Sequence, residues 1–100
     1  MSVPQIVALY GRLALLVPSP VVELNRAVAV AMVDGPERGL AMIEALGERL
    51  DGYQPFHAAR ADLLRRLHRA GEAAIAYQRA IGLTSNAAEL RFLESRLAAL

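Results

Sequence analysis

The chain has 100 residues, of which 55% are hydrophobic, with a formal net charge of +1 and no cysteine. This length predicts a single domain that folds as one cooperative unit, because two smaller domains would each bury too little apolar surface. The composition excludes disulfide frameworks and cysteine metal sites, and the near-zero net charge argues against a dedicated nucleic-acid-binding protein.

Turn and cap residues divide the chain into segments of helical length. The segment 17–20 offers Ser19 as an N-cap and Pro20 as the first helical residue. A glycine and a proline within 34–36 end one helix and begin the next, and DGYQP at 51–55 is a further break. We therefore predict six helices, at 4–16, 20–33, 36–49, 54–67, 70–83 and 86–99.

Two of these segments carry additional local signals. Asn86, followed three residues later by Glu89, has the spacing of a capping box at the start of the last helix. The segment 21–33 is rich in valine and alternates partly like a strand, so a buried strand is an alternative there. The Ser-Pro start and the lack of a partner strand elsewhere favour a helix.

No export or membrane segment is evident. The longest apolar run, AVAVAMV at 27–33, is too short to cross a hydrocarbon layer of about 30 Å. The N-terminal sequence MSVPQIV lacks the basic stretch and apolar block of an export signal. We expect a cytoplasmic protein that does not contact a membrane, and the absence of cysteine fits a reducing compartment.

The chain matches itself at an offset of 34 residues, with small residues aligned on small ones and large on large. The matched pairs are Ala27 with Ala61, Val30 with Leu64, Gly39 with Ala73, Ile43 with Tyr77, and Leu46 with Ala80. Small residues let two helix axes approach closely, and a large residue one turn later fills the space beside them. This period is that of the tetratricopeptide repeat, a pair of antiparallel helices.

The segment LLRRLHRAGEAAIAYQRAIGL, at 63–83, resembles tetratricopeptide helices. The resemblance implies an all-α, tetratricopeptide-like fold of antiparallel hairpins in a short right-handed solenoid. The single domain of residues 1–100 then has a leading helix within 4–19, repeats at 20–53 and 54–85, and a capping helix within 86–100. His68 stands where the family often has glycine, so either it adopts a left-handed conformation or the turn is built differently.

No constellation in the sequence favours catalysis, a cofactor or a metal. His57 and His68 are eleven residues apart and have no carboxylate at i+3 or i+4 to complete a metal site. Gly47 and Gly52 have the spacing of a phosphate loop, but Tyr53 and Gln54 follow where lysine and a hydroxyl residue are required. We expect a protein that is not an enzyme and that binds neither cofactor nor metal ion.

Polar residues on two predicted helices are candidates for protein contacts. His57 is expected to be buried and hydrogen-bonded, and it could form a polar cluster with Arg60 and Asp62 on its helix. The arginines near the end of that helix either complement its dipole or line a concave face on which an acidic partner segment docks. Asn25 could bond to a neighbouring helix end, and Arg26 could pair with Glu23 or with a partner. The protein-binding candidates are Asn25, Arg26, His57, Arg60, Asp62, Arg65 and Arg66.

The equivalent positions of the preceding repeat are apolar instead. They are Val21, Leu24, Val28 and Met32. Either the leading helix covers them as part of the core, or they form an apolar docking patch.

Three segments extend the resemblance beyond repeat patterning, namely PSPVVELNRAVAVA, HAARADLLRRL and ELRFLESRL. With their surroundings they resemble the C-terminal extension of a group of bacterial extracytoplasmic function (ECF) sigma factors, from Pro4 almost to Leu100. The resemblance implies a regulatory module that contacts the sigma-factor core domains, RNA polymerase or another regulator. It implies no direct contact with nucleic acid. The alternatives are a free-standing peptide-binding scaffold, an enzyme domain and a direct DNA binder.

Overall fold

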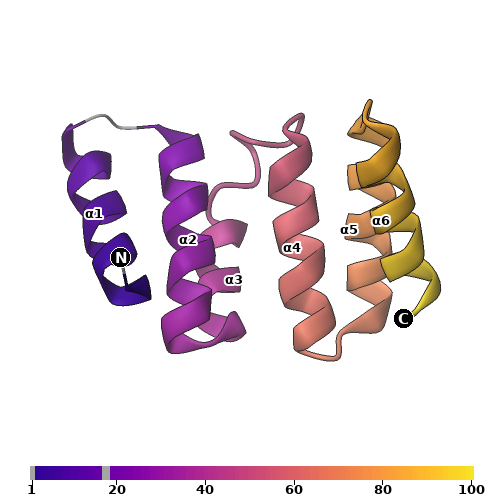
Figure 1. The fold of residues 1–100 in the computed structure, drawn as a ribbon, viewed down its shortest axis with the longest axis horizontal. Helices are drawn as coiled ribbons and strands as arrows, with labels where there is room; N and C mark the ends of the chain where they lie inside the picture. The colour runs from indigo at the N-terminus through magenta and orange to yellow at the C-terminus, as the bar shows by residue number, and fades with distance from the viewer. Residues whose placement is uncertain (1, 17–18) are drawn as a thin grey trace. The chain divides into compact units, whose positions relative to one another are not determined.

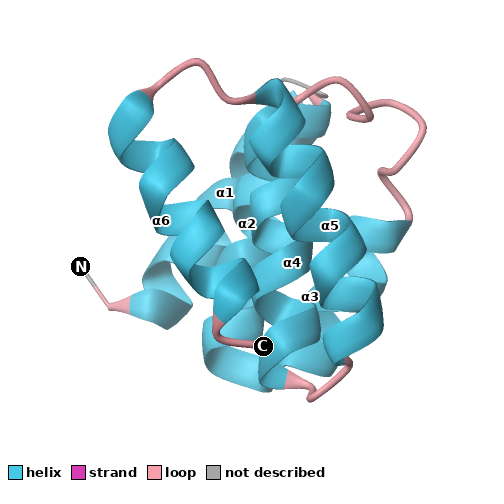
Figure 2. Cartoon of the chain, turned by 90° about the vertical axis from the view of Figure 1, so that its right-hand side faces the viewer, coloured by secondary structure: helices cyan, strands magenta, loops and turns pink. Residues whose placement is uncertain are grey.

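The fold consists of six α-helices, and the described part of the chain holds no strand (Figures 1 and 2). The computed structural model describes residues 2–16 and 19–100. The helices are α1 (Val3–Leu16), α2 (Pro20–Asp34), α3 (Pro36–Glu44), α4 (Gln54–Arg66), α5 (Ala70–Leu83) and α6 (Ala87–Ala98). The all-α prediction is confirmed, and only the end of the third helix differs by more than a residue or so.

The valine-rich second segment is helical throughout, so the strand alternative is wrong. Pro20 is the first residue of α2, where its missing N–H costs no hydrogen bond. Ser19 is the N-cap, as predicted, with extended backbone, and its side chain makes no capping hydrogen bond. The first two residues of the predicted break, Val17 and Pro18, lie outside the described residues.

The third helix ends at Glu44 and not at residue 49, as the sequence pattern predicted. Beyond it the backbone continues in tighter turns, in which Leu46 N–H donates to the Ile43 carbonyl at 2.9 Å and Arg49 N–H to the Leu46 carbonyl at 3.0 Å. Gly47 lies inside this stretch, and a glycine weakens a helix by roughly 1 kcal/mol relative to alanine. The turns still bury Leu46 and Leu50, so the apolar pattern is satisfied without a regular helix.

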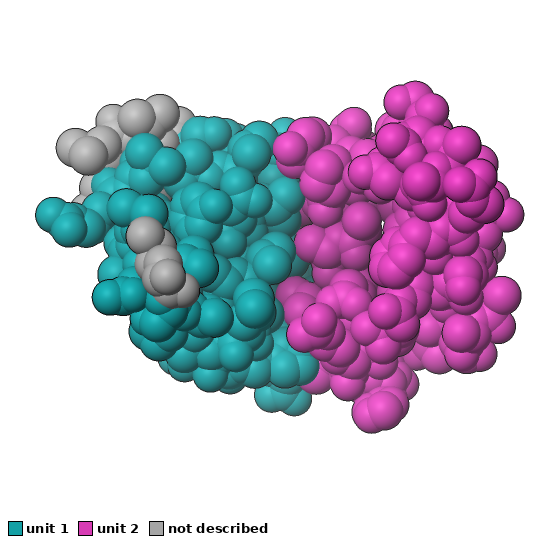
Figure 3. All heavy atoms as spheres, viewed as in Figure 1, with its two compact units in different colours: residues 1–50 teal, residues 51–100 magenta. Residues whose placement is uncertain are grey.

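The structure divides into two compact units, residues 1–50 and residues 51–100 (Figure 3). In the first unit α2 packs against both α1 and α3. In the second unit α5 packs against both α4 and α6. Each unit therefore has a central helix that packs against two others.

All five residue pairs at the 34-residue offset are buried, which confirms the packing role assigned to them. One of the small residues, Gly39, lies where α3 approaches α2 closely. At Gly39 of α3, an added Cβ would lie 2.9 Å from the Ala27 carbonyl oxygen and 3.0 Å from the Cα of Ala31, both on α2. Only glycine fits this contact, because contacts under 3.0 Å are sterically forbidden to a real Cβ.

In the turn between α4 and α5, His68 adopts the left-handed conformation, which was one of the two alternatives for this position. Its φ angle is 59°, and His68 is the one described residue other than glycine with a positive φ. Arg69 N–H donates to the Leu64 carbonyl at 3.0 Å, which closes the end of α4 as a left-handed C-cap residue allows. The histidine thus accepts the left-handed conformation that glycine adopts more readily.

The last helix has Asn86 as its N-cap, and the Asn86 half of the predicted capping box forms. The Asn86 side-chain oxygen accepts hydrogen bonds from the backbone N–H groups of Ala88 at 2.9 Å and Glu89 at 3.0 Å. These bonds satisfy two of the donors that a helix start leaves unpaired. Leu93 of α6 is buried.

Candidate functional site

The strongest charged network lies at the C-terminal end of α4. Arg65 Nη2 donates to Asp62 Oδ1 at 2.7 Å, and Arg66 Nε lies 2.9 Å from Asp62 Oδ2. The spacings of three and four residues place all three side chains on one face of the helix. The single carboxylate of Asp62 therefore forms ion pairs with both guanidinium groups, so one positive charge of the three side chains is not neutralised.

Arg65 is held more firmly than its neighbours. Hydrogen bonds to Asp62 and then to the Tyr77 side chain of α5 raise the pKa of Arg65 above its ordinary value. Its Nε is buried and has no hydrogen-bond partner in the described part of the chain. The arginine is thus a permanent cation in a fixed orientation, with part of its donor capacity unused.

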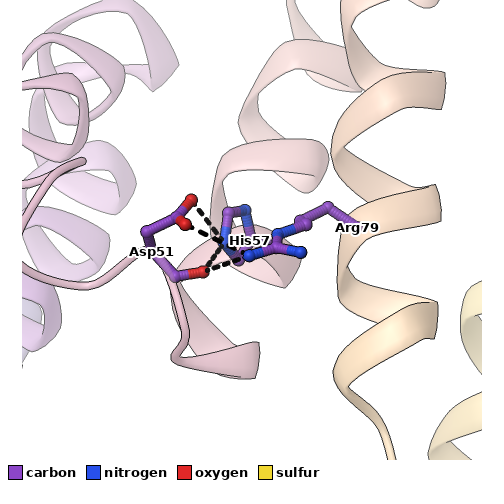
Figure 4. Close-up of polar contacts among 3 residues, drawn as sticks. All are labelled: Asp51, His57 and Arg79. Carbon is purple, nitrogen blue, oxygen red and sulfur yellow. Dashed lines mark hydrogen bonds and ion pairs between the residues drawn. The ribbon is translucent and has the colours of Figure 1, made fainter.

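A second polar cluster joins the start of α4 to α5 (Figure 4). The His57 Nε2 is hydrogen-bonded to the backbone carbonyl of Asp51 and lies 3.8 Å from Asp51 Oδ1. Arg79 Nη2 of α5 reaches the same residue, at 3.1 Å from Oδ2 and 3.3 Å from the carbonyl. Asp51, which precedes α4, is therefore bonded to one residue of α4 and to one residue of α5.

The burial of His57 favours a structural role for this second cluster. Its ring is 7% exposed and packs edge-on against Phe56, with centroids 4.9 Å apart and an interplanar angle of 79°. The prediction of a buried, hydrogen-bonded histidine is confirmed. The predicted grouping of His57 with Asp62 does not form, because Asp62 pairs with the arginines that follow it.

The remaining candidates are Arg60, Asn25 and Arg26. Arg60 is half-buried on α4, and Asn25 is exposed on α2. Arg26 Nη1 lies 3.9 Å from Glu23 Oε2, as predicted, and the guanidinium packs beside Gly11 of α1. Of the seven candidates, Asn25 and Arg26 belong to the first unit and the other five to the second.

Sequence reasoning missed Asp51 and Arg79 as members of a polar cluster. They are 28 residues apart, and neither falls on a motif or a helical spacing that includes the other. It also missed Arg96 of α6, whose guanidinium lies 5.2 Å from the ring centroid of Phe92. The only available signal was the four-residue spacing of Phe92 and Arg96 on one helix face.

The apolar positions predicted on the first repeat were assigned either to the core or to an apolar docking patch, and the structure shows residues of both kinds. Leu24 is buried, so it belongs to the core of the first unit, in which α1 packs against α2. Val28 and Met32 are 38% and 64% exposed, and these two residues form an apolar surface on α2. Leu9 on α1 is also exposed, beside a hollow lined by Gln5, Ala8 and Arg12.

Among the described residues, no histidine, aspartate and glutamate side chains gather in groups of three or more that could hold a metal ion. Of the helices over the same residues, not one combines the length and the apolar character needed to cross a membrane.

Among known proteins, the chain is similar to an uncharacterized protein of Rhizobium meliloti. The two are 54% identical over 89 residues, which is 89% of this chain and 21% of the relative. The chain thus spans about a fifth of the length of the curated relative that it matches. No protein-family model matches the chain, and no solved structure matches it.

Proposed function

We propose that this chain is a non-catalytic protein-interaction and regulatory module, with tetratricopeptide-like hairpins, appended to a bacterial ECF sigma factor. In this proposal the hairpins stack as a short right-handed solenoid. The module acts in the cytoplasm and modulates transcription initiation through contacts with the sigma-factor core domains, RNA polymerase or a regulator.

The observation that carries the proposal is the burial of equivalent positions 34 residues apart. Ala27 and Ala61 are both fully buried, and so is Ile43, whose counterpart Tyr77 is 2% exposed. Repeats of this period expose side chains of the first helix of each pair to partners. In the second hairpin that helix is α4, which carries Asp62, Arg65 and Arg66.

The more specific part of the proposal rests on the ECF resemblance. Its three diagnostic segments include most of α2, α4 and α6, so the resemblance follows the architecture and is not confined to one loop. The Rhizobium relative is about five times as long as the region that it shares with this chain, which leaves room in that protein for further domains.

The experiment is a pull-down with the tagged chain as bait against sigma-factor fragments and core RNA polymerase from the same bacterium. Retention of one of these proteins is expected, and it should weaken when Arg65 and Arg66 are both replaced by glutamine. Replacing Arg38 and Arg49 by glutamine removes the same charge from the first unit and serves as the matched control. Binding to unrelated peptides without binding to any sigma or polymerase component would favour a free-standing scaffold.

A further inference from the structure

A basic hollow of about 350 Å³ lies in the second unit, at the end of the molecule where α4 stops and α5 begins. It is lined by Arg65, His68, Ala70, Arg96, Ala99 and Leu100. These residues come from α4, the following turn, the start of α5 and the end of α6. None of the described residues that line it has an acidic side chain.

Arg96 is the cation of this hollow with the most freedom to bind. Within the described part of the chain it forms no ion pair, and its guanidinium lies over the ring of Phe92 at 5.2 Å. Phe92 is 57% exposed, so an apolar surface lies beside the charge. A guanidinium on an aromatic ring keeps its in-plane donors available to a carboxylate.

Arg65 adds a fixed positive charge on the opposite helix. Asp62 orients it, but the same carboxylate also serves Arg66, so the pair of arginines is only half neutralised. Its Nε is buried without a partner among the described residues, so any donor that Arg65 offers to the hollow comes from the other nitrogens of the guanidinium. His68 stands exposed between these elements, in the left-handed conformation of the turn.

We infer that this hollow binds a carboxylate side chain of an acidic peptide segment from a partner protein, with an apolar residue of that segment against Phe92. The inference rests on the proposed function as a partner-docking module and assigns its second unit a binding site. Charge complementarity selects an acidic occupant. The walls of Ala70, Ala99 and Leu100 favour a carboxylate carried on methylene groups over a fully hydrated phosphate.

The test uses a capped hexapeptide with two glutamates between leucines, titrated into the isotope-labelled chain. We expect the largest NMR shifts at the Nε–H groups of Arg65 and Arg96 and at the backbone of His68. Arg96→Gln should weaken binding about three- to five-fold, the size expected for a partly exposed ion pair. Arg91→Gln, an exposed arginine on the same helix outside the hollow, should leave the affinity unchanged.

Three results would overturn the inference. The glutamine version of the peptide could bind equally well, the two arginine variants could lose affinity equally, or inorganic phosphate could shift the same resonances at lower concentration than the peptide. Circular dichroism of both variants checks that each remains folded. If the sigma or polymerase pull-down succeeds with Arg96→Gln at full strength, this site fails while the proposed function stands. If the wild-type chain retains no sigma or polymerase component but still binds the peptide, the proposed function fails while this binding site stands.

Discussion

Tyr77 fills the space between α4 and α5 and also supports the charged network at the end of α4. Its side chain is 2% exposed, and its hydroxyl is one of the groups that raise the pKa of Arg65. Tyr77→Ala should lower the free energy of unfolding by about 3–5 kcal/mol, because it leaves a cavity where a ring was packed. Tyr77→Phe keeps the ring and loses only the hydroxyl, so we expect a loss of about 1 kcal/mol. Urea denaturation measures both, and an unchanged midpoint for the alanine variant would contradict the burial.

His68 holds a backbone conformation that costs a side-chain-bearing residue energy. With φ at 59° and an exposed side chain, it loses little packing when replaced. His68→Gly should therefore stabilise the chain by up to about 1 kcal/mol, since glycine adopts this conformation without steric cost. His68→Val is the opposing control, because a β-branched residue tolerates positive φ poorly. Thermal unfolding should rank glycine above histidine and histidine above valine, and any other order would show that the turn does not limit stability.

At the scale of the helical hairpin, Gly39 sets how closely α3 approaches α2. Gly39→Ala places a methyl group against Ala31 and 2.9 Å from the Ala27 carbonyl oxygen. We expect a loss of about 1–3 kcal/mol, as for other overpacked sites. Gly82→Ala on α5 is the matched control, because nothing lies within 4 Å of its added Cβ. In the Gly82→Ala variant the free energy of unfolding should rise by up to about 1 kcal/mol, because alanine has the higher helix propensity. Equal effects of the two substitutions on the urea midpoint would refute the close approach.

The N-cap residues of α2 and α6 should differ in how much they contribute to the free energy of unfolding. Asn86 accepts two backbone hydrogen bonds, whereas Ser19 occupies the same position without a side-chain bond. Asn86→Ala should cost about 1 kcal/mol of unfolding free energy, the typical value of an N-cap. Ser19→Ala should change it by much less. Calorimetric melting of the two variants checks this, and a larger loss at Ser19 would mean that its hydroxyl caps α2 after all.

For the molecule as a whole, the elements and the core were predictable from the sequence because both depend on local patterns. Prolines, glycines and Asn86 mark helix ends through backbone chemistry that acts within a few residues. The 34-residue repeat identified buried positions because a small side chain and its large neighbour must recur wherever two helices pack in the same way. The end of α3 was missed because Gly47 interrupts the helix without interrupting the apolar pattern.

The polar clusters were less predictable, for a different physical reason. Asp62 and its arginines are close in sequence, so helical spacing indicates their contact. The contact of Arg79 with Asp51 depends on how α5 packs against the segment before α4, and charge positions carry no periodic signal of such packing. A long arginine side chain can reach any of several acceptors, and only the folded geometry selects one.

The size of the two units bears on how the whole chain folds. Buried apolar residues are divided between residues 1–50 and 51–100, and each unit has only three helices. Chains of about 50 residues bury too small a fraction of their surface to be stable by a wide margin without disulfides or metals. We therefore expect peptides 1–50 and 51–100 to be largely unfolded when separate, and the intact chain to unfold in a single transition. Circular dichroism of the two peptides and calorimetry of the intact chain test this, with equal calorimetric and van't Hoff enthalpies as the criterion for one transition. Two resolved transitions, or native helicity in either peptide alone, would show that the units fold independently and that the chain is not one cooperative domain.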